Sequence, residues 1–156
     1  IPKEFARQVE ESVRGSLGAG VLAGFPVVDI VVILVNESKH EVDSTELAYK
    51  MAASIGLREA LRASQPVLLE PIMAVQVIVP EEFMGEVVGD LNRRQGRISG
   101  MQARSNSQVL DVNVPLRQMF GYTTDLRTVT QGRATHSMQF SHFDAVPEQI
   151  AKVIVG

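Results

Sequence analysis

Residues 72–79 read IMAVQVIV and are followed at once by Pro80, Glu81 and Glu82. The eight residues are apolar apart from Gln76 and rich in β-branched side chains, which is typical of a β-strand. A proline followed by acidic residues is typical of a helix N-terminus. The passage therefore predicts a strand followed directly by a helix. The inward side chains of that helix are Phe83, Val87, Val88 and Leu91, and Gly96 follows its end.

The rest of the C-terminal half continues this pattern. Residues 97–104 predict a weaker strand, and residues 109–114 alternate apolar and polar side chains, as in a strand with one wet face. Pro115 opens a helical stretch that Gly132 ends, residues 134–143 predict a last strand, and residues 148–155 a short terminal helix. The order β-α-β-β-α-β predicts a ferredoxin-like domain of the α+β class.

The first 70 residues predict two helices and one buried strand. Residues 27–35 read VVDIVVILV, which indicates a strand buried on both faces. Asp43 and Glu46 have the spacing of a capping box at the start of a helix. The other helix begins after Pro2, with an apolar stripe of Phe5, Val9, Val13 and Leu17. The inner face of the second helix is Leu47, Ala48, Met51, Ala52 and Ile55.

One strand between two helices does not make a complete domain, because its backbone donors and acceptors have no partners. We therefore expect the first lobe to be truncated. Its partner strands should lie before Ile1, or another molecule or the second lobe should supply them. Pro66 and Pro71 bracket a short connector, so we place the boundary at Glu70/Pro71, with domains 1–70 and 71–156.

Composition excludes several classes of protein. Apolar residues make up 45% and charged residues 21%, which argues against a disordered chain. The formal net charge of −3 excludes nucleic-acid binding by bulk charge, so any RNA contact must be local. The absence of cysteine fits a reducing compartment, and we expect a cytoplasmic protein. The longest apolar run, residues 30–35, is too short to span a bilayer, so no membrane partner is expected.

The motifs that could carry catalysis have simpler explanations. Glycines 18, 20 and 24 follow a helix and precede a strand, the reverse of a phosphate cradle, and no P-loop sequence occurs. His136 and His142 share strand parity with Met138 and Phe140, which predicts packing at the core margin rather than a metal site. We expect no metal, no catalytic residue and no enzyme activity in this chain.

Two local features could contact a partner. The four arginines between Leu91 and Leu110, at positions 93, 94, 97 and 104, have no acidic residue among them. They suit phosphate recognition, and a solvated surface explains them equally well. The polar stretch 36–44 carries His40 between a predicted strand and a helix, so it could reach a partner or simply be exposed. Base stacking on the central strands is not expected, because they carry no aromatic residue.

Several motifs in this order resemble the C-terminal part of bacterial elongation factor G. They are residues 38–46 (SKHEVDSTE), 66–73 (PVLLEPIM), 89–96 (GDLNRRQG), 114–116 (VPL), 119–122 (MFGY), 125–127 (DLR) and 131–134 (QGRA). The resemblance covers essentially the whole chain. It implies that residues 1–70 are the second half of the fourth domain, similar to the second domain of a small-subunit ribosomal protein. Residues 71–156 would be the ferredoxin-like fifth domain.

In that family the parent is a translational GTPase that moves transfer RNA and messenger RNA through the ribosome. The resemblance implies that the nucleotide-binding domain lies upstream. GTP and magnesium are therefore expected in the full-length parent, and no cofactor is expected here. The implied partners are ribosomal RNA, transfer RNA and messenger RNA, and we expect a monomer.

The resemblance also implies where these partners bind. The tip that enters the decoding site and contacts transfer RNA and messenger RNA would be Ser38, Lys39, His40 and Glu41, with His40 at the position that carries diphthamide in the eukaryotic counterpart. Arg127, Thr128 and Gln131 would face the sarcin–ricin loop of ribosomal RNA, and we add Arg93 and Arg94 as ribosomal RNA contacts.

The predicted function is that of a non-catalytic, ribosome-engaging module whose His40 loop hinders backward slippage of the transfer-RNA/messenger-RNA pair. The same module in a ribosomal protection protein or a recycling-type paralogue is one alternative. A ferredoxin-like small-molecule regulatory domain is another, and it predicts a dimer with a pocket at the interface.

Overall fold

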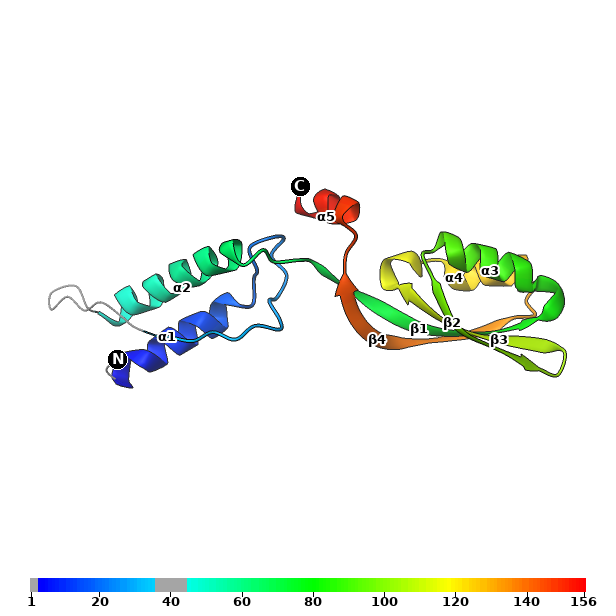
Figure 1. The fold of residues 1–156 in the computed structure, drawn as a ribbon, viewed down its shortest axis with the longest axis horizontal. Helices are drawn as coiled ribbons and strands as arrows, with labels where there is room; N and C mark the ends of the chain where they lie inside the picture. Colours follow the sequence, from blue (N-terminus) through cyan, green and yellow to red (C-terminus); the bar gives the residue numbers. More distant parts are fainter. Residues whose placement is uncertain (1–2, 36–44) are drawn as a thin grey trace. The chain divides into compact units, whose positions relative to one another are not determined.

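A computed structural model describes residues 3–35 and 45–156 of the chain (Figure 1). Its contacts divide the chain into two compact units. Unit 1 comprises residues 1–68 and 147–156, and unit 2 comprises residues 69–146. The terminal helix thus groups with the first unit, although the sequence placed it in the second. The domain boundary at Glu70/Pro71 stays a prediction.

Unit 2 is a four-stranded antiparallel sheet with two helices on one face (Figure 1). The strands are β1 (Leu69–Pro80), β2 (Arg97–Arg104), β3 (Ser107–Pro115) and β4 (Thr135–Ala145), in the order β2-β3-β1-β4. Helix α3 (Met84–Arg93) follows the 3-10 turn Glu81–Phe83, and α4 (Tyr122–Val129) follows the 3-10 turn Leu116–Gln118. The predicted ferredoxin-like order is confirmed.

The core of unit 2 lies between the sheet and these helices. Every second side chain of β1 and β3 points toward the helices, because successive strand residues alternate between faces. The buried set is Val75, Val77 and Val79 from β1, Leu110, Val112 and Val114 from β3, Val87 and Leu91 from α3, Tyr122 and Leu126 from α4, and Met119. The opposite face of the sheet carries polar side chains such as Gln76 and Asp111.

A β-bulge between β1 and β4 corrects one prediction about the histidines. Met73 pairs with Phe140 but Ile72 pairs with His142, so the alternation shifts by one residue. His136 precedes the bulge and lies edge-on to the Tyr122 ring, with centroids 5.1 Å apart, at the core margin as predicted. His142 follows it and is exposed. Its predicted core position is wrong because the parity argument assumed an unbroken register.

In its described residues, unit 1 has the helices α1 (Lys3–Ser16), α2 (Glu46–Ala63) and α5 (Glu148–Val155). The first two pack together: Phe5 stacks on Tyr49 with centroids 4.4 Å apart, and the Ser12 hydroxyl donates to the Lys50 carbonyl at 2.7 Å. The N-cap of α2 is Thr45, whose hydroxyl accepts from the Ala48 amide at 3.1 Å. The cap is therefore Thr45 and not the predicted Asp43.

No described helix has the length and hydropathy needed to cross a bilayer.

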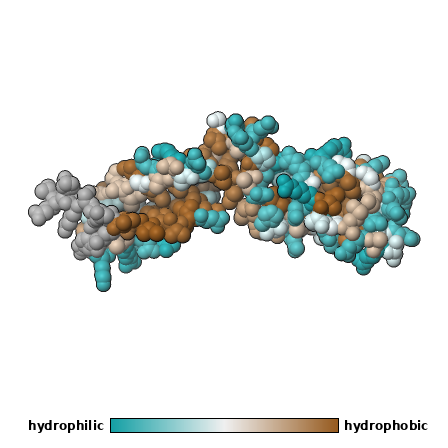
Figure 2. All heavy atoms as spheres, viewed as in Figure 1, coloured by the Kyte–Doolittle hydropathy of each residue, from teal (hydrophilic) through white to brown (hydrophobic). Residues whose placement is uncertain are grey.

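The buried strand predicted for residues 27–35 is not formed. The segment has no strand partner among the described residues, and Val31 and Val35 are each 86% exposed. The predicted inner face of α2 is also exposed at Leu47, Met51 and Ile55. Figure 2 shows the apolar surface that runs along residues 25–35. A strand needs a hydrogen-bonded neighbour, so β propensity alone leaves this segment irregular.

Candidate nucleic-acid interface

The predicted tip residues Ser38, Lys39, His40 and Glu41 lie outside the described residues. The site that can be built from geometry is therefore on unit 2. Its candidates are the residues predicted to contact ribosomal RNA, which are Arg93, Arg94, Arg127, Thr128 and Gln131.

Arg127, Thr128 and Gln131 lie together at the C-terminal end of α4, and all three are exposed. We call them the α4 surface. Gln131 and Gly132 both have a left-handed backbone, with φ of 53° and 76°. The Gly132 amide donates to the Arg127 carbonyl at 2.9 Å, which is a common way for a helix to end. The backbone that carries Gln131 is therefore a defined turn.

Thr130 holds this turn in place, and its side chain is fully buried. Its hydroxyl donates to the Leu126 carbonyl at 2.6 Å and accepts from the Ala134 amide at 3.3 Å. Arg133 then forms an ion pair with Glu82 at the start of the 3-10 turn before α3. The turn that carries the α4 surface is therefore hydrogen-bonded to α4 and to Ala134, which precedes β4. The adjacent Arg133 links it to the 3-10 turn before α3.

The charge of the α4 surface is not neutralised by the residues that the structure describes. No acidic side chain of residues 3–35 or 45–156 forms an ion pair with Arg127, whereas the nearby Arg133 is paired. The Arg127 guanidinium can thus donate to a phosphate oxygen, and its planar fork suits that geometry. Gln131 adds a side-chain donor beside it. The Thr128 hydroxyl donates to the Thr124 carbonyl at 2.9 Å, so its oxygen is available to a partner as an acceptor.

Arg94 points into the molecule instead. Its side chain is 12% exposed, and its guanidinium donates to Asp90 Oδ2 at 2.9 Å and forms an ion pair with Asp125. It also donates to the carbonyls of Gln118 at 2.5 Å and Phe120 at 3.3 Å. Arg94 therefore joins the end of α3 to the start of α4. Because these donors are used internally, we leave Arg94 out of the proposed RNA contacts.

Tyr122 lies next to this arginine in the core. The Arg94 guanidinium carbon is 5.1 Å from the ring centroid, and the buried Tyr122 hydroxyl has no hydrogen-bond partner among the described residues. Burial, and then the negative charge of Asp90, raise the pKa of Tyr122 to about 12, while Arg94 acts in the opposite direction. The phenol therefore stays protonated at neutral pH, and its role is packing.

The structure does not bring all the predicted RNA-contact residues together. Arg93 lies at the C-terminal end of α3, and its side chain is 76% exposed and forms an ion pair with Asp90 at 3.3 Å. The α4 surface lies at the C-terminal end of α4, an eight-residue helix whose other end is joined to α3 by Arg94. A helix of that length spans about 12 Å. The arginines of α3 and the α4 surface are thus separate features.

Sequence reasoning missed Phe120, which is 79% exposed directly after the buried Met119. The sequence placed both residues in one apolar helical stretch. In the structure they lie in a turn before α4, where Gly121 has φ of 76°. Gly121 itself was the available signal, because a glycine within a helical pattern can mark a turn.

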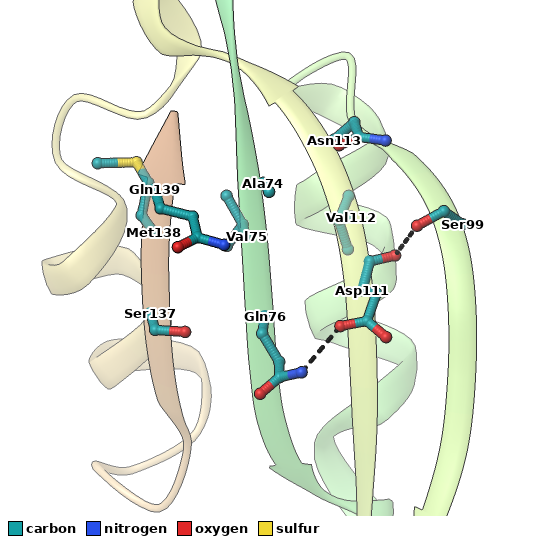
Figure 3. A pocket seen from close by; sticks show the side chains of 10 residues that line it. All are labelled: Ala74, Val75, Gln76, Ser99, Asp111, Val112, Asn113, Ser137, Met138 and Gln139. Atoms are coloured by element: carbon teal, nitrogen blue, oxygen red, sulfur yellow. Dashed lines mark hydrogen bonds between the residues drawn. The ribbon is translucent and has the colours of Figure 1, made fainter. Parts of the chain in front are cut away.

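Figure 3 shows a hollow of about 260 Å³ on the open face of the sheet. Gln76 Nε2 donates to Asp111 Oδ1 at 2.9 Å, and the Ser99 hydroxyl donates to the Asp111 carbonyl at 3.2 Å. Neither an aromatic nor a basic side chain lines the hollow. It therefore provides neither a stacking platform nor a phosphate contact.

Comparisons with known proteins match both parts of the chain. The family described as "Elongation factor G, domain IV" matches residues 1–65, and the family described as "Elongation factor G C-terminus" matches residues 67–154. A crystal structure of a protein from Thermus thermophilus is 39% identical over 99% of this chain, with a TM-score of 0.87. This chain spans 24% of the length of that protein's chain.

Proposed function

Because the chain belongs to the elongation factor G family, we propose that it engages the ribosome as the non-catalytic part of a translational GTPase that moves transfer RNA and messenger RNA. The observation that carries this proposal is the α4 surface, in which an unpaired arginine and two polar side chains stand on a turn anchored by the buried Thr130. Such a surface suits phosphate and sugar groups of ribosomal RNA.

The first unit has a different role in this proposal. Its α1 and α2 helices pack together, and α2 begins immediately after the segment that contains His40. A stiff helical pair can present such a segment to a partner. We propose that Ser38, Lys39, His40 and Glu41 contact transfer RNA and messenger RNA and hinder their backward slippage. This role is tested by timing translocation with the full-length protein that carries His40→Ala. An unchanged rate of translocation would rule the role out.

GTP and magnesium would bind elsewhere in the full-length protein. A phosphate cradle needs free backbone amides at a helix N-terminus that follows a strand. The junction after β1 begins with Pro80, Glu81 and Glu82, where the proline lacks an amide donor and the carboxylates repel phosphate. This junction does not fit a nucleotide, so we assign no catalytic step to this chain.

The central test compares two arginines in the full-length protein bound to ribosomes. Arg127→Gln should weaken binding and reduce the slope of log affinity against log salt by about 1, because one phosphate contact is lost. Arg104→Gln, at the end of β2, makes the same change of charge outside the α4 surface and serves as the control. Equal effects of the two substitutions would show that Arg127 makes no specific contact.

The alternatives predict different results. A ribosomal protection or recycling-type paralogue would bind ribosomes through the same surface but would not speed translocation. A small-molecule regulatory domain predicts a dimer, whereas we propose a monomer. The hollow of Figure 3 is lined by residues of unit 2 alone, and the regulatory role would require a second copy to complete a pocket there. Light scattering of the purified chain distinguishes monomer from dimer.

A further inference from the structure

We propose that Phe120 is a base-stacking anchor, whose ring packs against an unstacked base of RNA while Arg93 reaches an adjacent phosphate. The inference rests on the proposed ribosome-binding role and adds a second contact to it. This contact lies at the start of α4, away from the α4 surface.

The first support is the combination of exposure and a fixed backbone. The Phe120 side chain is 79% exposed, yet its own carbonyl and that of Gln118 accept hydrogen bonds from the largely buried Arg94. Buried Met119 holds the preceding residue in the core, and Gly121 turns the chain with φ of 76°. The ring is thus presented from a fixed turn, and little backbone freedom would be lost on binding.

The second support is the chemistry around the ring. Arg93 lies at the same end of α3 as Arg94, and its side chain is 76% exposed. One of its nitrogens, Nη2, donates to Asp90 Oδ1 at 3.3 Å, and the rest of the exposed guanidinium can donate to a phosphate. The neighbouring Gly121, Thr123 and Thr124 are exposed and not apolar. Protein hot spots usually lie in well-packed pockets, whereas a single exposed aromatic ring on a surface that also carries arginine is typical of contacts with unpaired RNA bases. The surroundings therefore favour RNA over a protein partner.

Photo-crosslinking on purified bacterial ribosomes tests the partner directly. The full-length protein is prepared with Phe120→p-benzoylphenylalanine, and Thr123→p-benzoylphenylalanine serves as the control on the first turn of α4. We expect position 120 to crosslink to an unpaired ribosomal RNA nucleotide more strongly than position 123. Crosslinks only to a ribosomal protein, or no excess over position 123, would overturn the proposal.

Affinity measurements test the stacking itself. Phe120→Leu should weaken ribosome binding by about fivefold to a hundredfold, the range found for loss of one stacked base, whereas Phe120→Trp should preserve it. Phe120→Leu should leave the salt slope unchanged, and Arg93→Gln should reduce it by about 1. Because Phe120 is exposed, thermal unfolding of the leucine variant should match that of the wild type, which excludes a folding defect.

The outcomes separate this inference from the proposed function. If the full-length protein binds ribosomes and Arg127→Gln weakens binding, but Phe120→Leu binds as the wild type does, only the stacking contact is wrong. If the full-length wild-type protein does not bind ribosomes at all, the proposed function fails and the stacking contact fails with it. Equal losses for Phe120→Leu and Phe120→Trp would also overturn stacking, because a tryptophan ring can stack on a base and a leucine side chain cannot.

Discussion

Two apolar segments of this chain, both rich in β-branched residues, differ in whether they form a strand. Residues 72–79 become the centre of β1, which pairs with β3 on one side and β4 on the other. Residues 27–35 have a similar composition but no strand partner among the described residues, and most of their side chains are exposed. The difference shows that β propensity describes a fit to neighbouring strands rather than a preference of the isolated backbone.

The largest expected effect comes from placing the same charge in both segments. Val77→Lys would bury an unpaired ammonium at a fully buried position, and we expect a loss of more than about 4 kcal/mol, enough to unfold unit 2. Val31→Lys, at a position 86% exposed, should change the free energy of unfolding by less than about 0.5 kcal/mol. Urea unfolding followed by circular dichroism measures both.

Val31→Lys should have a separate effect on association. An exposed β-prone segment whose only charged residue is Asp29 is prone to pair with other chains, and a lysine in its apolar stretch opposes this pairing. Light scattering over a range of concentrations should therefore show less self-association than in the wild type. A large loss of stability in this variant would mean that residues 27–35 are packed, and the contrast between the two segments would disappear.

The contrast also explains how much the sequence could predict. In unit 2 the strands, helices and βαββαβ order followed from local patterns, because every segment finds its partners within the described unit. The strand at residues 27–35 is not formed, because no described segment supplies the partner strand whose absence from the sequence pattern was already evident. His142 was misplaced because one bulge residue reverses the side-chain parity that follows it.

The candidate site was predictable in part for similar reasons. Sequence motifs identified Arg127, Thr128 and Gln131, which the structure groups at one helix end. They could not distinguish Arg93 from Arg94, since adjacent arginines look alike in a sequence. Their different roles follow from three-dimensional partners, because only Arg94 reaches Asp125 and the carbonyls before α4.

That pair of arginines provides the second prediction. Arg94→Met removes a guanidinium that is 12% exposed. It leaves two carbonyls without this donor and Asp90 with only its 3.3 Å contact to the exposed Arg93, so we expect a loss of roughly 2 to 4 kcal/mol. Arg93→Met, at a side chain 76% exposed, should cost less than about 0.5 kcal/mol. Thermal unfolding of the two variants makes the comparison. Similar values would show that the internal network of Arg94 contributes little.

The third prediction concerns alkaline pH and the core of unit 2. The pKa of Tyr122 is raised from 10.0 to about 12, so the unfolded chain loses this phenol proton at a lower pH than the folded chain. The contribution to stability is complete below pH 10 and falls as the pH rises toward 12. Its full size is roughly 2 to 3 kcal/mol, from the free energy of a two-unit pKa difference.

Tyr122→Phe isolates this contribution because it keeps the ring. The variant should lose less stability than the wild type between pH 9 and pH 11, as measured by urea unfolding at each pH. At neutral pH it should be about 1 kcal/mol more stable, because it removes a buried hydroxyl without a partner. Parallel pH profiles of the two proteins would contradict the raised pKa.

The smallest effect is expected at the start of α2, where unit 1 depends on local capping more than on a core. Thr45→Ala removes the acceptor of the Ala48 amide and should destabilise the helix by about 1 kcal/mol, whereas Thr45→Ser keeps the oxygen and should cost only a few tenths. Hydrogen exchange of the Ala48 amide measures this directly, since an uncapped amide exchanges faster. In unit 2, α4 begins without any side-chain cap and is held by Arg94. If Thr45→Ala left exchange at Ala48 unchanged, packing against α1 alone would hold the first turn of α2, and the two units would be alike in relying on tertiary contacts.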